Sequence, residues 1–270
     1  MTSATEPVLR VESRGGVDWL TMNRPQRLNA LDAALVKALR EYFEGLNARS
    51  SARVVVLQGA GRAFCAGLDL KDQAAAGSDA PPGVSEMLEQ QKGIRDIMLA
   101  MRRCPQPIIS VVQGAASGGG FALALASDVR LATPDARMNA AFIRIGLGAC
   151  DVGVSYFLPR MVGSSVAAEY MLTGRFMDAQ RAYALGLVSR VGPLAELQAE
   201  AQALADDMLH ATPLALRLTK EALGLAVDAA SMEAVIALED RNQVLCTQTS
   251  DFQEGMSAFL EKRAPRFTGR

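Results

Sequence analysis

Histidine is almost missing from this chain of 270 residues, in which His210 is the only one. A histidine-rich metal site needs several imidazoles, and a serine–histidine–aspartate triad needs one beside its nucleophile. His210 lies far along the chain from the glycine-rich turns at residues 57–70 and 111–132. Ordinary zinc chemistry and serine-hydrolase chemistry are therefore excluded, and no metal site is expected.

Paired cysteines and a secretion signal are also missing. The four cysteines, Cys65, Cys104, Cys150 and Cys246, are far apart and form no CxxC motif. The first residues, MTSATEPVLR, lack the apolar stretch of a signal peptide. These features predict reduced thiols and a cytoplasmic location.

The chain has neither an excess of one charge nor a long apolar run. Its 28 basic and 29 acidic residues give a net charge of −1. Without a basic field, a nucleic-acid partner is not expected. No apolar run reaches the roughly 20 residues that a membrane span needs, so no membrane partner is expected. Half of the residues are apolar, which allows one large core.

Two cycles of strand, glycine turn and helix occupy the first part of the chain. Strands are predicted near residues 8–13, 15–24 and 53–59, with a helix at Asp32–Leu46. The second cycle has a helix at Glu86–Met101, an apolar strand at 107–114, and a glycine turn that leads into the helical FALALAS. This alternation indicates a mixed α/β fold.

Helical patterns dominate after about residue 195, where three are expected. In one of them, Leu214, Leu218, Ala222 and Leu225 share a face. We therefore predict a core at residues 1–195 and a helical region at 196–270 that makes subunit contacts. Residues 74–83, AAAGSDAPPG, have the composition of a loop that could cover a site.

The glycine turn GAASGGG needs an explanation, because its glycines could serve ligand binding or packing. It lacks the GxGxxG spacing and the following Lys-Ser/Thr of nucleotide-binding loops. Close packing of helix on strand is one explanation. However, the earlier turn LQGAGRAFCAGLDL also ends a strand, and one crossover would make the two turns neighbours. Two converging backbone N–H groups would stabilise an oxyanion.

Five motifs in register resemble those of the crotonase (enoyl-CoA hydratase/isomerase) superfamily. They are NRPQRLNAL, AFCAGLDL, QGAASGGGFALALASD, LTGRFMDAQRAYALGLVSRV and SDFQEGMSAFLEKRAPRF. The resemblance covers nearly the whole chain. It implies a spiral of ββα units followed by C-terminal helices, assembled as a homotrimer or a dimer of trimers.

The resemblance also assigns residues to an acyl-CoA site. Leu68 and Gly119 would donate backbone N–H groups to the thioester oxygen of the substrate. Arg27, Ala66 and Lys262 would contact CoA, the lysine by reaching a neighbouring subunit. No cofactor is implied, because CoA arrives as part of the thioester.

The chemistry implied by the resemblance is not that of an ordinary hydratase. The two glutamates of family hydratases would fall at Ala122 and Phe142, which cannot transfer a proton. Asp151 falls, with one extra residue before it, near the catalytic aspartate of the dienoyl-CoA isomerase branch. A single carboxylate suffices for double-bond isomerisation.

Alternatives accompany these assignments. Asp151 precedes VGVSYFL and could instead be a helix N-cap. Asp69 is expected to organise its turn, and Asp128 to begin a strand. Structural or solvent-exposed roles are expected for Ser117, Arg144, Ser155, Tyr156, Glu239 and Asp240. The alternative function is an acyl-CoA-binding protein with vestigial catalysis.

Overall fold

The computed structural model describes residues 6–71 and 83–269 of the chain. A six-stranded sheet has the order β1-β2-β3-β4-β6-β9. Its strands are β1 (Leu9–Arg14), β2 (Val17–Met22), β3 (Val54–Gly59), β4 (Ile108–Val112), β6 (Val129–Ala132) and β9 (Arg190–Val191). All neighbours run parallel except the β1–β2 hairpin. The strands predicted near 8–13, 15–24, 53–59 and 107–114 are confirmed.

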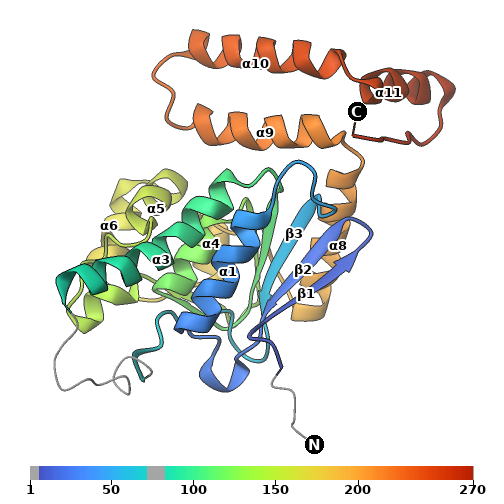
Figure 1. Cartoon of the computed structure of the whole chain (residues 1–270). Helices are drawn as coiled ribbons and strands as arrows, with labels where there is room; N and C mark the ends of the chain where they lie inside the picture. The colour runs from blue at the N-terminus through green and yellow to red at the C-terminus, as the bar shows by residue number, and fades with distance from the viewer. Residues whose placement is uncertain (1–5, 72–82, 270) are drawn as a thin grey trace, which may run out of the picture.

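The sheet is covered on both faces, because its strands alternate between two clusters of buried side chains. Leu20 and Met22 of β2 belong to one cluster, and Val17 and Trp19 belong to the other. The first cluster includes residues of α1 (Ala33–Gly45), α3 (Val84–Arg103) and α4 (Gly119–Ala126). The second includes residues of α8 (Leu194–Leu209), which crosses behind the sheet in Figure 1.

The first predicted helix, Asp32–Leu46, is confirmed as α1. Asp32 is the N-cap of α1, and its carboxylate accepts the N–H of Leu35. The second predicted helix, α3, is longer at both ends than Glu86–Met101. Its buried residues lie in the C-terminal half and include Ile97, Met98 and Met101.

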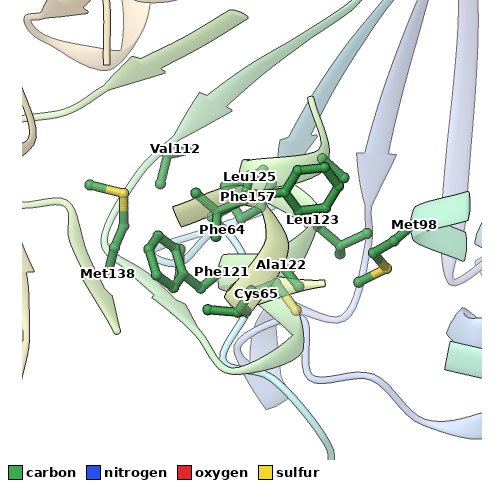
Figure 2. Packing of buried hydrophobic residues seen from close by; sticks show 14 of the residues in the cluster. Phe64, Cys65, Met98, Val112, Phe121, Ala122, Leu123, Leu125, Met138 and Phe157 are labelled. Atoms are coloured by element: carbon green, nitrogen blue, oxygen red, sulfur yellow. The ribbon is translucent and has the colours of Figure 1, made fainter. Parts of the chain in front are cut away.

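The helix that follows the three glycines is the centre of the fold. Every residue of α4 is buried, from Gly119 to Ala126. Figure 2 shows Phe121 of α4 in the core together with Phe64 and Phe157 from other parts of the chain. A helix of small and apolar residues without a polar face can only be stable inside a core.

A small second sheet was not predicted from the sequence. It joins β5 (Ala115–Ser117), β7 (Arg137–Asn139) and β8 (Met177–Asp178), in the order β5-β7-β8. Strands of two or three residues carry too little pattern to be recognised. The short 3-10 helices η1 (Pro25–Arg27) and η2 (Ala141–Ile145) were missed for the same reason.

Helices α5 (Val154–Val162) and α6 (Ser164–Thr173) lie between β7 and β8 in the chain, and α7 (Ala179–Ala184) lies between β8 and β9. Four helices, not the three expected, then occupy the rest of the chain: α8, α9 (Pro213–Ala226), α10 (Met232–Thr247) and α11 (Ser250–Glu261). Only two residues separate α10 from α11, where Thr249 caps the new helix. Such a short break is easily read as one continuous pattern.

The last three helices extend beyond the core. Figure 1 shows α9 and α10 stacked above the sheet, with α11 beside the C-terminus. Leu214 and Leu218 on the predicted face of α9 are half-buried, but Leu225 remains exposed. In contrast, α8 packs on the sheet, and Trp19 Nε1 donates to Gln202 Oε1 at 3.1 Å. None of the helices within residues 6–71 and 83–269 is long and apolar enough to cross a membrane.

Candidate active site

The two glycine-containing turns lie side by side, as the sequence predicts. Cys65 N donates to Ala115 O, and Ser117 N donates back to Cys65 O, both at 3.0 Å. Cys65 and Ala116 therefore form a parallel bridge between segments about 50 residues apart. The strands β3 and β4, which precede the two turns, are themselves parallel neighbours.

Two glycines make this approach possible. A Cβ atom on Gly120 would lie 2.1 Å from Cys65 O, so only glycine fits there. Gly67 has φ +91°, and a Cβ on it would lie 2.6 Å from Ser117 O and 3.6 Å from Gly119 N. Close packing, the simpler explanation of the glycine turn, is therefore correct for Gly120. Close packing does not explain why backbone N–H groups in these two turns have no acceptor among the residues that the structure describes.

The N–H groups of Leu68 and Gly119 have no hydrogen-bond acceptor within the described residues. Their neighbours along the chain are engaged: Asp69 N donates to Leu31 O at 3.0 Å, and Gly118 N donates to Asn139 O at 2.9 Å. Gly119 is also the first residue of α4, where the helix dipole places partial positive charge. Both N–H groups can therefore donate a hydrogen bond to a negatively charged acceptor.

Apolar side chains border this pair of donors. A Cβ on Gly118 would lie 3.4 Å from the Phe142 ring. Ala122 is completely buried in α4. Cys65 is also completely buried, and burial raises the pKa of its thiol to about 12. Neither Phe142 nor Ala122 carries a group that can transfer a proton, and the Cys65 thiol stays protonated at neutral pH.

Asp151 is not the helix cap that one interpretation of the sequence expects. The N-cap of α5 is Gly153, which has φ +92° and offers no side chain. The Asp151 carboxylate instead accepts the Val152 N–H at 2.8 Å and a hydrogen bond from the Gln91 side chain on α3. The two residues with φ above +20° that follow it, Val152 and Gly153, delay the start of the helix.

Arg27 belongs to a cluster of charged side chains around Asp69. Arg27 donates to both carboxylate oxygens of Asp69, at 3.2 and 2.9 Å. Arg24 pairs with Asp69 at 3.1 Å and with Asp32 at 3.0 Å. Asp69 is only 5% exposed, whereas the Arg27 side chain is 36% exposed. Asp69 therefore joins its turn to the segment that carries Arg24 and Arg27, and part of the Arg27 side chain remains in solvent.

The other predicted CoA residues lie apart from one another. Ala66 is half-buried, and its N–H donates to Leu28 O at 3.0 Å. Lys262 ends α11 with φ +55°. Figure 1 places α11 at the opposite end of the molecule from the turn before α1 that holds η1. Within one chain Lys262 is therefore not part of the site, and its predicted role requires a neighbouring subunit.

The remaining polar residues have the structural surroundings that the sequence suggests. Asp128 directly precedes β6 and accepts the Ile108 N–H at 2.8 Å. Arg144 Nε donates to Gly174 O at 2.9 Å, and Tyr156 bonds Asp228 in the loop after α9. The latter bond, followed by burial, raises the pKa of Tyr156. Ser117 is half-buried, while Ser155, Glu239 and Asp240 are exposed.

One partner of Asp151 was missed from the sequence. Gln91 stands in EQQKG, in the solvent-exposed first half of α3. An amide there has no periodicity or spacing that would distinguish it from its neighbour Gln90. The predicted cover, residues 74–83, lies outside the described residues except for Gly83, which precedes α3.

Comparison with known proteins identifies the family. The model of the family described as enoyl-CoA hydratase/isomerase matches residues 12–270. The chain belongs to the enoyl-CoA hydratase/isomerase family. It is 39% identical to the probable enoyl-CoA hydratase echA12 of Mycobacterium bovis, over 98% of this chain and 94% of that protein. The chain is thus an enzyme of the hydratase/isomerase type.

Two other members of this hydratase/isomerase family are informative. The 1,2-epoxyphenylacetyl-CoA isomerase of Escherichia coli is 33% identical, over 94% of this chain and 96% of its own. The crystal structure of an enoyl-CoA hydratase from Bacillus anthracis superposes with a TM-score of 0.90 at 32% identity, covering 97% of this chain and all of that one. The predicted crotonase fold is therefore confirmed.

Proposed function

We propose that this enzyme moves a double bond within an acyl-CoA thioester by way of an enolate. The observation that carries the proposal is the pair of unengaged N–H groups on Leu68 and Gly119 within the described chain. Backbone donors cannot swing away, and they stabilise negative charge that develops on a thioester oxygen. The N-terminus of α4 adds to the field at that point.

Asp151 is the proposed proton carrier. Its carboxylate would remove a proton from the α- or γ-carbon and return it to the other end of the dienolate, so the substrate gains and loses no atoms. A hydratase of the two-carboxylate type needs a second acid. Ala122 and Phe142, at the positions that the resemblance assigns to those acids, cannot serve. One relative named as an isomerase of a CoA thioester supports this choice.

The acyl-CoA substrate would extend from the donor pair toward η1. The exposed side of the Arg27 guanidinium is a suitable partner for the CoA pyrophosphate, and Asp69 fixes its orientation. Ala66 lies two residues before Leu68, in the same turn. Lys262 of a neighbouring subunit would complete the CoA contacts in the proposed trimer or dimer of trimers.

Turnover of a panel of CoA thioesters tests the proposal. We expect 3-enoyl-CoA or dienoyl-CoA substrates to rearrange without uptake of water, and hydration of 2-enoyl-CoA to be slow. Product mass distinguishes the two reactions, because hydration adds one water and isomerisation adds nothing. Hydration faster than isomerisation across the panel would overturn the proposal.

Binding of the substrate class has its own test. Acyl-CoA thioesters should raise the melting temperature, since a ligand at 100 times its Kd stabilises the native state by about 2.7 kcal/mol. If several acyl-CoA thioesters near millimolar concentration cause no shift, an acyl-CoA substrate is ruled out.

A further inference from the structure

The Asp151 carboxylate is held by only one of its two oxygens. Oδ1 accepts the side-chain amide N–H of Gln91 and, at 2.8 Å, the backbone N–H of Val152. Within the described residues, Oδ2 has neither a hydrogen bond nor an ion pair. The carboxylate is therefore oriented through Oδ1, and Oδ2 is left available.

One of the two anchors comes from a different element of the fold. Gln91 lies on α3, 60 residues before Asp151. The buried residues Ile97, Met98 and Met101 attach the C-terminal half of α3 to the core. A group carried on a packed helix is placed more reproducibly than one carried on a loop. Gln91 therefore links the Asp151 loop to a helix whose C-terminal half is packed on the core.

The other anchor depends on an unusual backbone conformation. Val152 has φ +38°, and the residue is only 8% exposed. A β-branched residue rarely adopts positive φ, and such a conformation persists only when its surroundings enforce it. Val152 belongs to the buried core cluster, which positions the loop. Its backbone N–H donates to Asp151 Oδ1.

We infer that Gln91 is a positioning residue, which orients Asp151 so that Oδ2 transfers the proton. The inference rests on the proposed role of Asp151 in isomerisation. A neutral amide suits this task, because it binds a carboxylate oxygen without adding a charge that would compete for it. An amide also cannot exchange a proton with the substrate, so proton transfer remains with Asp151.

The substitution Gln91→Leu tests this inference, with Gln90→Leu as the matched control. Both glutamines are exposed on the same helix, and only Gln91 bonds Asp151. Leucine is at least as good a helix former, so folding is preserved. We expect Gln91→Leu to lower kcat roughly tenfold, since a misplaced reacting group slows the reaction steeply. KM should change less than about twofold, and Gln90→Leu should have wild-type kinetics.

A double-mutant cycle separates positioning from a general structural effect. If Gln91 acts through the Asp151 carboxylate, Gln91→Leu should cause no further loss in the Asp151→Asn background. Rate losses that multiply in the double variant, or a Gln91→Leu variant that matches Gln90→Leu, would overturn the inference while leaving the role of Asp151 intact. Full turnover by Asp151→Asn alone would overturn the proposed proton carrier, and the inference with it. Gln91→Ala repeats the measurement should the leucine substitution alter the melting temperature.

Discussion

Lys220 on α9 and Asp128 at the start of β6 form an ion pair, with 3.0 Å between Nζ and Oδ2. Lys220 Nζ also donates to Met101 O at 3.1 Å and to Gln106 O at 2.6 Å. Asp128 in turn bonds Arg102 at 2.6 Å. Lys220 is the one buried residue of α9, all of which the structure describes. Its hydrogen bonds and ion pair therefore connect α9 to the core.

Lys220→Met should therefore lower the free energy of unfolding by about 2 kcal/mol, because the buried carbonyls of Met101 and Gln106 lose their charged donor. Asp128 keeps Arg102 as its partner. Lys37→Met is the control. Lys37 pairs with Glu41 at the surface, with side chains 67% and 55% exposed, and such pairs contribute less than about 1 kcal/mol. Urea unfolding measures the free energy of unfolding of both variants. An equal loss in the two would contradict a stabilising role for the Lys220 contacts.

The glycines of the turn should differ in their tolerance of alanine. Gly120→Ala would place a Cβ 2.1 Å from a backbone oxygen, whereas Gly119→Ala would meet only the end of the Leu31 side chain, at 2.8 Å. Backbone atoms cannot move aside without disturbing the two turns. We expect Gly120→Ala to lower stability by about 3 kcal/mol and Gly119→Ala to lower it by less. Thermal unfolding that ranks them in the opposite order would contradict this explanation.

Asp151→Asn should leave acyl-CoA affinity and melting temperature near the wild-type values, because the proposed substrate donors are backbone groups. Turnover should fall about 10²-fold, the scale of a lost general acid or base. Asparagine keeps an oxygen that can accept the Gln91 and Val152 N–H groups, so the loop should stay in place. A variant that retains turnover would remove Asp151 from the mechanism.

The cysteines should differ in reactivity and in their response to pH. Cys150 is exposed and Cys65 is buried, and burial raises the Cys65 pKa from 9.0 to about 12. At pH 8, iodoacetamide should label Cys150 and spare Cys65, because the thiolate is the nucleophile. The raised pKa also means that the Cys65 contribution to stability is complete below about pH 9 and is lost as the pH rises toward 12. Peptide mass mapping checks the labelling, and rapid labelling of native Cys65 would disprove its burial.

The exposed apolar side chains of the last helices predict an oligomer. On α9, α10 and α11 they include Leu223, Met232, Val244, Phe259 and Leu260, which are between 61% and 81% exposed. Clusters of this kind are usually covered in an assembly. Sedimentation at micromolar concentration should give a trimer or a dimer of trimers. A monomer would contradict the predicted role of residues 196–270.

The sequence by itself determined the main elements and the two turns. Continuous β-branched runs gave β3 and β4, the helical pattern from Asp32 to Leu46 gave α1, and glycines after both strands indicated two accessible backbones. These signals are local, since each depends on residues within a few positions of one another. The same is true of the motif resemblance that named Leu68, Gly119 and Asp151.

Only the tertiary structure decided which contacts those residues make. The hydrogen bond between Gln91 and Asp151 spans 60 residues, and that between Lys220 and Gln106 spans 114. Neither is encoded in spacing along the chain, because both depend on how α3 and α9 pack on the core. The tertiary structure also decided that Gly153, not Asp151, is the N-cap of α5, because the chain first passes through two residues of positive φ, Val152 and Gly153.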